Sequence, residues 1–219
     1  QHLLSAIRRQ YGLNEDQAEE LYTQVLDACT AIDVTLIGGH SEVTYGIDRP
    51  IVSGTMLGEV ARDRLVRTGG AQDGDSIVVT KGIAIEGTAL LARERADDLR
   101  KAGVSDDTIT LSAELLINPG ISVLIDARIA CTNAQIHSMH DVTEGGLITG
   151  LREVAAASGL GLAIEEGSVP LLGPTEEVCN ALDLDPMGLL ASGALLITLP
   201  SSEVPSLLVA LEQKGIDGW

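Results

Sequence analysis

Short apolar runs alternate with helical patterns along this chain, and the alternation constrains the fold more than any other feature. Apolar runs between turn residues predict buried strands, and apolar residues at helical spacing predict amphipathic helices. We therefore expect an α/β or α+β protein with helices layered on a sheet. The expected strands are 34–37, 50–60, 76–80, 135–139, 162–164 and 194–199. The expected helices are 14–30, 105–117, 121–130, 146–158, 176–182, 201–214 and one that opens within 81–88 and runs to 101.

The core of such a fold has to be aliphatic here. Hydrophobic residues make up 45% of the chain, but it has no Phe, one Trp and three Tyr. With 219 residues the chain is long enough for one large domain or two small ones. The polar, glycine-rich stretch 68–75 is the best candidate for a boundary. We predict two domains, 1–67 and 68–219.

The ends of the sequence suggest a piece of a longer protein. It begins with Gln1 rather than Met and stops at Trp219, just after a helical pattern. We expect that the N-terminal domain is incomplete in this chain.

Charge and cysteine usage exclude several classes of function. The formal net charge is −18, a field that repels nucleic-acid phosphates and anionic lipid surfaces, so neither partner is expected. No apolar run reaches the roughly 18–20 residues of a membrane span. The three cysteines, Cys29, Cys131 and Cys179, are widely spaced and form no Cys-x-x-Cys motif. That spacing argues against a zinc site or a disulfide framework and predicts a cytoplasmic protein.

Three segments place glycines and acids directly after an expected strand, where ligands commonly bind. The first is 38–42, with Gly38 and Gly39 followed by His40 and Glu42. Two glycines let the backbone approach a ligand closely. His40 or Glu42 would then orient a phosphate or ligate Mg²⁺ through water. The alternative is an ordinary turn with a solvated carboxylate.

The second segment is 140–146, where four polar residues are followed by two glycines: His140, Asp141, Thr143, Glu144, Gly145 and Gly146. Asp141 suits Mg²⁺, which prefers one or two carboxylates together with phosphate oxygens and waters. His140 suits a general acid or base, or a phosphate donor. The alternative is helix capping, with Asp141 or Thr143 as the N-cap.

The third segment, 80–88, lacks the ending of a phosphate-binding P-loop, and its glycines do not fit the dinucleotide fingerprint. It is a weaker functional candidate, and the alternative is an ordinary strand-to-helix loop. His137 falls inside the strand before His140, so we expect it to be structural.

Together these segments resemble the aminoimidazole ribonucleotide synthetase (AIR synthase) superfamily. Residues 38–42 look like its Gly-Gly-acid-Thr segment, and 140–147 look like its His-Asp-x-Ser/Thr-x-Gly-Gly-Leu segment. Residues 74–79 look like the Gly-Asp strand that opens its C-terminal domain. The order and spacing also match. The residues at 38–44 and 49–52 are most similar to those of synthase-related members near the hydrogenase-maturation carbamoyl dehydratase.

The resemblance implies a two-domain fold, a homodimer formed through the N-terminal domain, and Mg²⁺·ATP bound in a cleft. It implies ATP-dependent activation of an amide or carbonyl oxygen, with a small molecule or a carbamoylated protein as acceptor. Asp141 and His140 would be catalytic, and Asp141 and Glu42 would hold the metal. The nucleotide or its phosphates would contact a set of mostly small residues: Gly38, Gly39, His40, Thr143, Gly145 and Gly146.

Two departures from the superfamily keep other functions open. His40 stands where many relatives carry an acid, and no cysteine lies at the C-terminal end, where the dehydratase carries its carbamoyl group. The alternatives are a small-molecule kinase of the same superfamily and a non-catalytic nucleotide-binding maturation factor.

Overall fold

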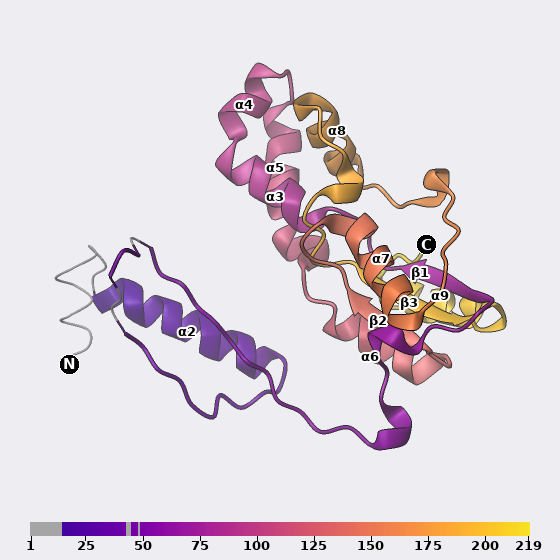
Figure 1. Ribbon diagram of the computed structural model, residues 1–219. Helices are drawn as coiled ribbons and strands as arrows, with labels where there is room; N and C mark the ends of the chain where they lie inside the picture. Colours follow the sequence, from indigo (N-terminus) through magenta and orange to yellow (C-terminus); the bar gives the residue numbers. More distant parts are fainter. Residues whose placement is uncertain (1–14, 43–44, 48) are drawn as a thin grey trace. The chain divides into compact units, whose positions relative to one another are not determined.

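The computed structural model describes residues 15–42, 45–47 and 49–219, and it divides the chain into two compact units, Gln1–Glu59 and Val60–Trp219. Figure 1 shows the elements of each unit. The two units are described separately below. The domain boundary that the sequence predicts between residues 67 and 68 stays a prediction.

The described part of the first unit contains one helix, α2 (Glu15–Ala31), followed by extended chain. Two strands were predicted here, at 34–37 and 50–60, and both predictions are wrong for the described residues. A strand needs a neighbour to pair its backbone groups, and the described part of this unit holds no strand. The apolar side chains of these stretches are consequently exposed, with Ile37 at 85% and Leu57 at 78%.

The second unit is built on a three-stranded antiparallel sheet. Its strands are β1 (Asp75–Val79), β2 (Ser138–Asp141) and β3 (Leu195–Pro200), in the order β1-β3-β2. Val79 pairs with Leu196, and Asp141 pairs with Leu195. Because β3 runs antiparallel to both neighbours, β1 and β2 run in the same direction. Their carboxyl ends therefore lie at the same edge of the sheet.

Helices cover both faces of this sheet (Figure 1), which explains why the central strand β3 is apolar at every position except Thr198. On one face, Val79 and Leu196 pack with the helix α7 (Gly146–Ser158). On the other face, Val78 and Ile197 pack with α6 (Leu124–Asn133) and α9 (Val204–Glu212). Successive residues thus point to opposite faces, as the two-residue period of a strand requires.

A further group of helices packs beside the sheet around Ala92, Leu99, Ile109 and Val178. They are α3 (Ile85–Glu94), α4 (Ala96–Lys101), α5 (Asp106–Glu114) and α8 (Gly173–Leu182). The single helix predicted to run to residue 101 is wrong, because it breaks at Arg95, whose φ is −125°. The predicted cap at Ser105 is confirmed, since its Oγ accepts a hydrogen bond from the backbone N–H of Thr108.

Short helical turns connect these elements. They are Arg62–Arg64, Thr68–Gly70, Leu116–Gly120, Glu166–Ser168, Pro186–Gly188 and Ser201–Glu203. The strand predicted at 162–164 is absent, and this stretch is extended chain without ladder hydrogen bonds. The fold of the second unit is α+β, and its sheet is antiparallel throughout the described residues.

Within the described residues, no single helix has both the length and the apolar character needed to cross a bilayer. The bent pair 106–120 and 124–133 meets that test on length and composition alone.

Candidate functional site

Two loops meet at the edge of the sheet where β1 and β2 end. The loop after β1 spans residues 80–84, and the loop after β2 spans residues 142–145. Ile83 and Ala84 of the first loop share one buried cluster with Val142 of the second. A third loop, 187–194, joins them, because the N–H of Gly87 donates to the carbonyl of Leu190 and the N–H of Ala191 donates to that of Thr143. This sheet-end site is the place where the predicted residues of the second unit gather.

The 80–84 loop has an unusual backbone. Lys81 and Ala84 both have a positive φ, 64° and 58°, which L-residues with a Cβ adopt only at a cost. Hydrogen bonds hold the loop in this shape: the N–H of Lys81 donates to the Asp217 carbonyl, and that of Ile83 donates to the Pro170 carbonyl. Strained backbone fixed by its surroundings occurs often at functional sites.

Lys81 and Asp126 form an ion pair inside the protein. The Lys81 Nζ lies 3.2 Å from Asp126 Oδ2, and the two side chains are 5% and 1% exposed. Lys81 also donates a 2.7 Å hydrogen bond to the carbonyl oxygen of Ser122. Buried charges of this kind are unfavourable unless they are paired, so each of these groups depends on the other.

Asp141, the last residue of β2, keeps an exposed carboxylate at the edge of the site. Partial burial raises the pKa of Asp141 above its usual value, and the nearby positive groups of His140 and Lys81 oppose that rise. The negative charges of Asp126 and Glu86 raise the pKa further. Positive and negative groups thus both act on this carboxylate, and the metal-binding role of Asp141 stays a prediction.

His140 is held at both ring nitrogens. Its Nε2 lies 2.7 Å from Glu153 Oε2 on α7, and its Nδ1 lies 3.4 Å from the hydroxyl of Thr68. The ring is about 20% exposed. The long contact to Thr68 is weak by hydrogen-bond criteria, so Nδ1 is the nitrogen at which a ligand can exchange a proton.

The helix that follows the second loop begins without a side-chain cap. Gly145 is the N-cap of α7 in a left-handed conformation, and α7 has no side-chain cap bond. The capping alternative for Asp141 and Thr143 therefore lacks support. A hydrogen bond from its own backbone N–H and one from the Thr143 hydroxyl lower the pKa of Glu144.

Gly146 has a structural reason to be glycine. A Cβ at this position would lie 2.4 Å from the carbonyl oxygen of Met187 and 2.7 Å from that of Leu189. The 187–189 segment thus packs directly against the start of α7.

The other predicted segment, 38–42, belongs to the first unit, where it is extended and exposed. His40 and Glu42 form a 3.5 Å contact, with side chains 81% and 68% exposed. A Cβ on Gly38 or Gly39 would meet no described atom within 4 Å. The roles of these four residues stay predictions.

His137 is engaged with another buried side chain. Its Nδ1 lies 2.9 Å from Asp75 Oδ1, and the side chains of this pair are 12% and 8% exposed. The pair joins the first residue of β1 to the residue before β2, a structural arrangement of the kind the sequence predicts.

Sequence reasoning missed Lys81, Asp126 and Glu86 as members of the sheet-end site. The glycines of the 80–88 segment dominate its sequence pattern, and Lys81 stands before them without a recognisable motif. An aspartate within the apolar stretch 124–130 was a further signal, because a charged residue there has to be buried with a partner.

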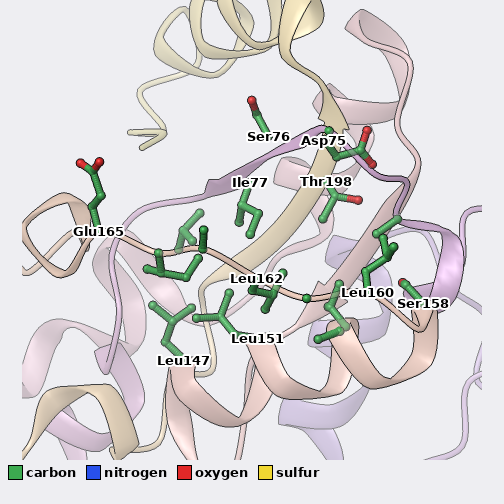
Figure 2. Close-up of a pocket in the computed structure, with 18 of the residues that line it drawn as sticks. Asp75, Ser76, Ile77, Leu147, Leu151, Ser158, Leu160, Leu162, Glu165 and Thr198 are labelled. Carbon is green, nitrogen blue, oxygen red and sulfur yellow. The ribbon is translucent and has the colours of Figure 1, made fainter.

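A groove of about 500 Å³ lies between β1, α7 and the extended segment 160–165, and Val79 and Leu147 of its lining belong to the buried cluster that the two loops share. Figure 2 shows Ile77 of β1 and Leu147 and Leu151 of α7 around Leu162. The lining includes neither His140 nor Asp141. In the described residues, no group of three or more His, Cys, Asp or Glu side chains is arranged to hold a metal ion. A metal at the sheet-end site would thus take most of its ligands from a bound phosphate and water.

Family models match nearly the whole chain. The model described as AIR synthase related protein, C-terminal domain, matches residues 72–219, and the corresponding N-terminal domain model matches residues 2–60.

Several curated proteins are similar to this chain. A protein of Methanocaldococcus jannaschii, provisionally named for hydrogenase expression and formation, is 28% identical over 202 residues, which is 92% of this chain and 57% of that protein. The carbamoyl dehydratase HypE of Cupriavidus necator is 28% identical over 75% of this chain and 43% of its own length. A selenide, water dikinase of Geobacter metallireducens is 30% identical over 70% of this chain and 40% of its own length. The chain spans about half the length of the curated relatives it matches.

Solved structures share the fold. The hydrogenase maturation protein HypE in complex with ATP superposes with a TM-score of 0.65 at 21% identity, covering 94% of this chain and 60% of that one. The thiamine monophosphate kinase of Aquifex aeolicus superposes with a TM-score of 0.62 at 18% identity, covering 87% of this chain and 62% of that one.

Proposed function

Because the chain belongs to the AIR synthase-related family, we propose that the intact protein is an ATP-dependent enzyme that phosphorylates an amide or carbonyl oxygen, in the manner of a dehydratase or cyclo-ligase. The family and the AIR-synthase-like fold predicted from the sequence are confirmed by the family models and the structural matches. The reaction itself is the proposal.

Nucleotide binding by related structures supports ATP as the co-substrate. HypE has been solved with ATP, and a ThiL protein of the same fold has been solved with AMPPCP and TMP. We propose ATP with Mg²⁺ for this chain as well. Bound Mg²⁺·ATP would supply the phosphoryl group that turns the acceptor oxygen into a leaving group.

The observation that carries the proposal is the sheet-end site itself. The exposed carboxylate of Asp141 and the start of α7 lie where two parallel-running strands end, and His140, the residue before Asp141, faces α7 on the other side of the sheet, where it contacts Glu153. Mg²⁺ needs only one or two carboxylates when phosphate oxygens complete its shell, so Asp141 fits as a protein ligand. Thr143, Gly145 and Gly146 form the turn beside it. In a reaction of this type, positioning and neutralisation of charge lower the barrier most.

His140 fits a proton-transferring role. Its Nε2 contact to Glu153 fixes the orientation of the ring. A proton released by the attacking acceptor group would be taken at Nδ1. We assign Gly38, Gly39, His40 and Glu42 to the nucleotide side, with Glu42 as a second metal ligand, on the family resemblance alone.

A small-molecule kinase is the second candidate, because the fold also matches thiamine monophosphate kinase. A kinase would leave a stable phosphorylated acceptor, whereas a dehydratase would release free phosphate. A non-catalytic nucleotide-binding maturation factor is the third candidate, and it would bind ATP without turnover.

The proposal includes a second copy of the chain as partner and a small molecule or carbamoylated protein as acceptor. Apolar side chains of the first unit, such as Ile37 and Leu57, are exposed and would be covered in a homodimer. We also propose a cytoplasmic location, from the cysteine spacing.

The test uses the intact protein with Mg²⁺·ATP, with and without a carbamoylated acceptor peptide, and measures ADP and phosphate. Acceptor-stimulated release of both supports the dehydratase-like reaction. A phosphorylated acceptor without free phosphate supports the kinase. The matched variants are Asp141→Asn and, as control, Asp107→Asn in the exposed first turn of α5. Equal turnover by these two variants would remove Asp141 from the site.

A further inference from the structure

Lys81 occupies a position that its backbone makes costly. A non-glycine residue with φ near +60° costs about 1–2 kcal/mol, and glycine would avoid most of this. Ala84, three residues on, has the same backbone conformation, and Gly82 between them has a φ of 151°. A lysine is therefore retained at a backbone position that glycine would occupy at lower cost. Strain of this kind is a reason to look for a role of the side chain.

The position of the Lys81 ammonium is fixed by one hydrogen bond and one ion pair. The Ser122 carbonyl oxygen lies 2.7 Å from Nζ, and Asp126 Oδ2 lies 3.2 Å from it. An ammonium has three N–H groups. Among the described residues, the Ser122 carbonyl accepts a hydrogen bond from this group and Asp126 pairs with its charge, so at least one N–H has no acceptor there.

Asp126 acts through its charge. It is 1% exposed, and neither of its carboxylate oxygens has a hydrogen-bond partner among the described residues. An unpartnered buried carboxylate is unfavourable unless a positive charge lies beside it. The Lys81 ammonium, 3.2 Å from Asp126 Oδ2, supplies that positive charge.

The pair lies at the sheet-end site. Lys81 follows β1 by two residues, and Asp141 ends β2 at the same edge of the sheet. Both Lys81 and Asp126 act electrostatically on Asp141, as do His140 and Glu86. A chain with a net charge of −18 repels phosphate groups, so a phosphate site within it needs a fixed positive charge.

We propose that Lys81 binds a phosphoryl oxygen at the sheet-end site and that Asp126 is the positioning residue that holds its ammonium. The proposal rests on the proposed function in one respect, namely that the phosphoryl group belongs to ATP or to the phosphorylated acceptor. Nothing in the sequence pattern of the 80–88 segment assigns this role to Lys81.

The first experiment compares Lys81→Met with Lys101→Met in the intact protein. Lys101 is 76% exposed in α4, so its variant is the matched control for loss of a lysine charge. Calorimetric titration with Mg²⁺·AMPPCP and with inorganic phosphate separates the two sources of phosphate. Loss of a charge-assisted hydrogen bond should weaken the bound probe by about 10- to 100-fold in Lys81→Met. The Lys101→Met protein should bind as the wild type does.

Each outcome decides one claim. Wild-type affinity in Lys81→Met, or a wild-type protein that binds neither probe, overturns the proposal for Lys81. A wild-type protein that binds phosphate but no nucleotide overturns the proposed ATP-dependent function, and the phosphate site at Lys81 then stands on its own titration.

The second experiment tests Asp126 and keeps the proposal testable if Lys81→Met does not fold. In Asp126→Asn, the Lys81 ammonium loses the charge that holds it in place, so phosphate affinity at pH 7 should fall about 10-fold. Lys81→Arg, which keeps the positive charge, should retain more of the binding than Lys81→Met. Lower thermal stability of Asp126→Asn with wild-type phosphate affinity would show that Asp126 is only structural.

Discussion

Replacing Gly146 with alanine should weaken the second unit more than the same change at Gly159, although the two glycines flank the same helix. Gly146 opens α7 with a φ of 66°, and Gly159 follows its end with a φ of 69°. Alanine in this backbone region costs about 1–2 kcal/mol at either position. The backbone cost of the substitution is therefore the same at the two positions, and only the surrounding atoms differ.

The surroundings set the difference. A Cβ at Gly159 would meet nothing within 4 Å, whereas a Cβ at Gly146 would lie 2.4 Å and 2.7 Å from two backbone carbonyl oxygens of the 187–189 segment. Backbone does not yield as a flexible side chain does, and overpacking of this kind costs about 1–3 kcal/mol more. We expect a total of about 2–5 kcal/mol for Gly146→Ala and about 1–2 kcal/mol for Gly159→Ala.

Urea unfolding of the intact protein, followed by circular dichroism, measures both free energies of unfolding. Thermal unfolding should agree, at about 2–4 °C per kcal/mol for a unit of this size. If Gly146→Ala is no less stable than Gly159→Ala, the 187–189 segment does not pack against the start of α7. The described geometry of the sheet-end site would then be wrong.

Three further predictions follow from the site and the fold. Asp141→Asn should reduce ATP turnover at least about 100-fold with folding intact, measured by ADP release, because a positioned charge is lost; turnover within a few-fold of wild type would contradict it. The pKa of Asp141 is raised in the folded state, so the folded protein favours the protonated carboxyl. The ionised carboxylate therefore lowers the free energy of unfolding once the pH rises through this raised pKa. Asp141→Asn should consequently have a higher Tm than wild type at pH 7, with the gain shrinking as pH falls toward 3.8, and a constant difference would refute this. Ser105→Ala should cost about 0.5–2 kcal/mol in urea unfolding through loss of the α5 cap, whereas equal stability would show that the cap bond contributes nothing.

Local chemistry made part of the fold predictable from the sequence. The strand at 194–199 is apolar at every position except Thr198 because helices cover both its faces, and the Ser105 cap depends only on neighbouring residues. The strands predicted at 34–37 and 162–164 are absent for a different reason. A strand exists only when another segment pairs with it, and an apolar run does not say whether that partner is present.

The candidate site was likewise predictable only in part from the sequence. Asp141 and His140 were predicted because they stand directly after a strand and before two glycines. Asp126 lies 15 residues earlier in sequence, inside α6, and only the packing of α6 against the sheet brings it to Lys81. Contacts of that kind depend on the tertiary fold, so a single sequence without the structure does not specify them.

Backbone amide shifts of the intact protein, recorded by NMR during titration with Mg²⁺·AMPPCP, test the central claim most directly. The account predicts that the largest changes within the second unit fall in residues 80–85 and 141–147, at the edge where β1 and β2 end. Changes confined to residues 160–165, or no change at saturating nucleotide, would contradict the account.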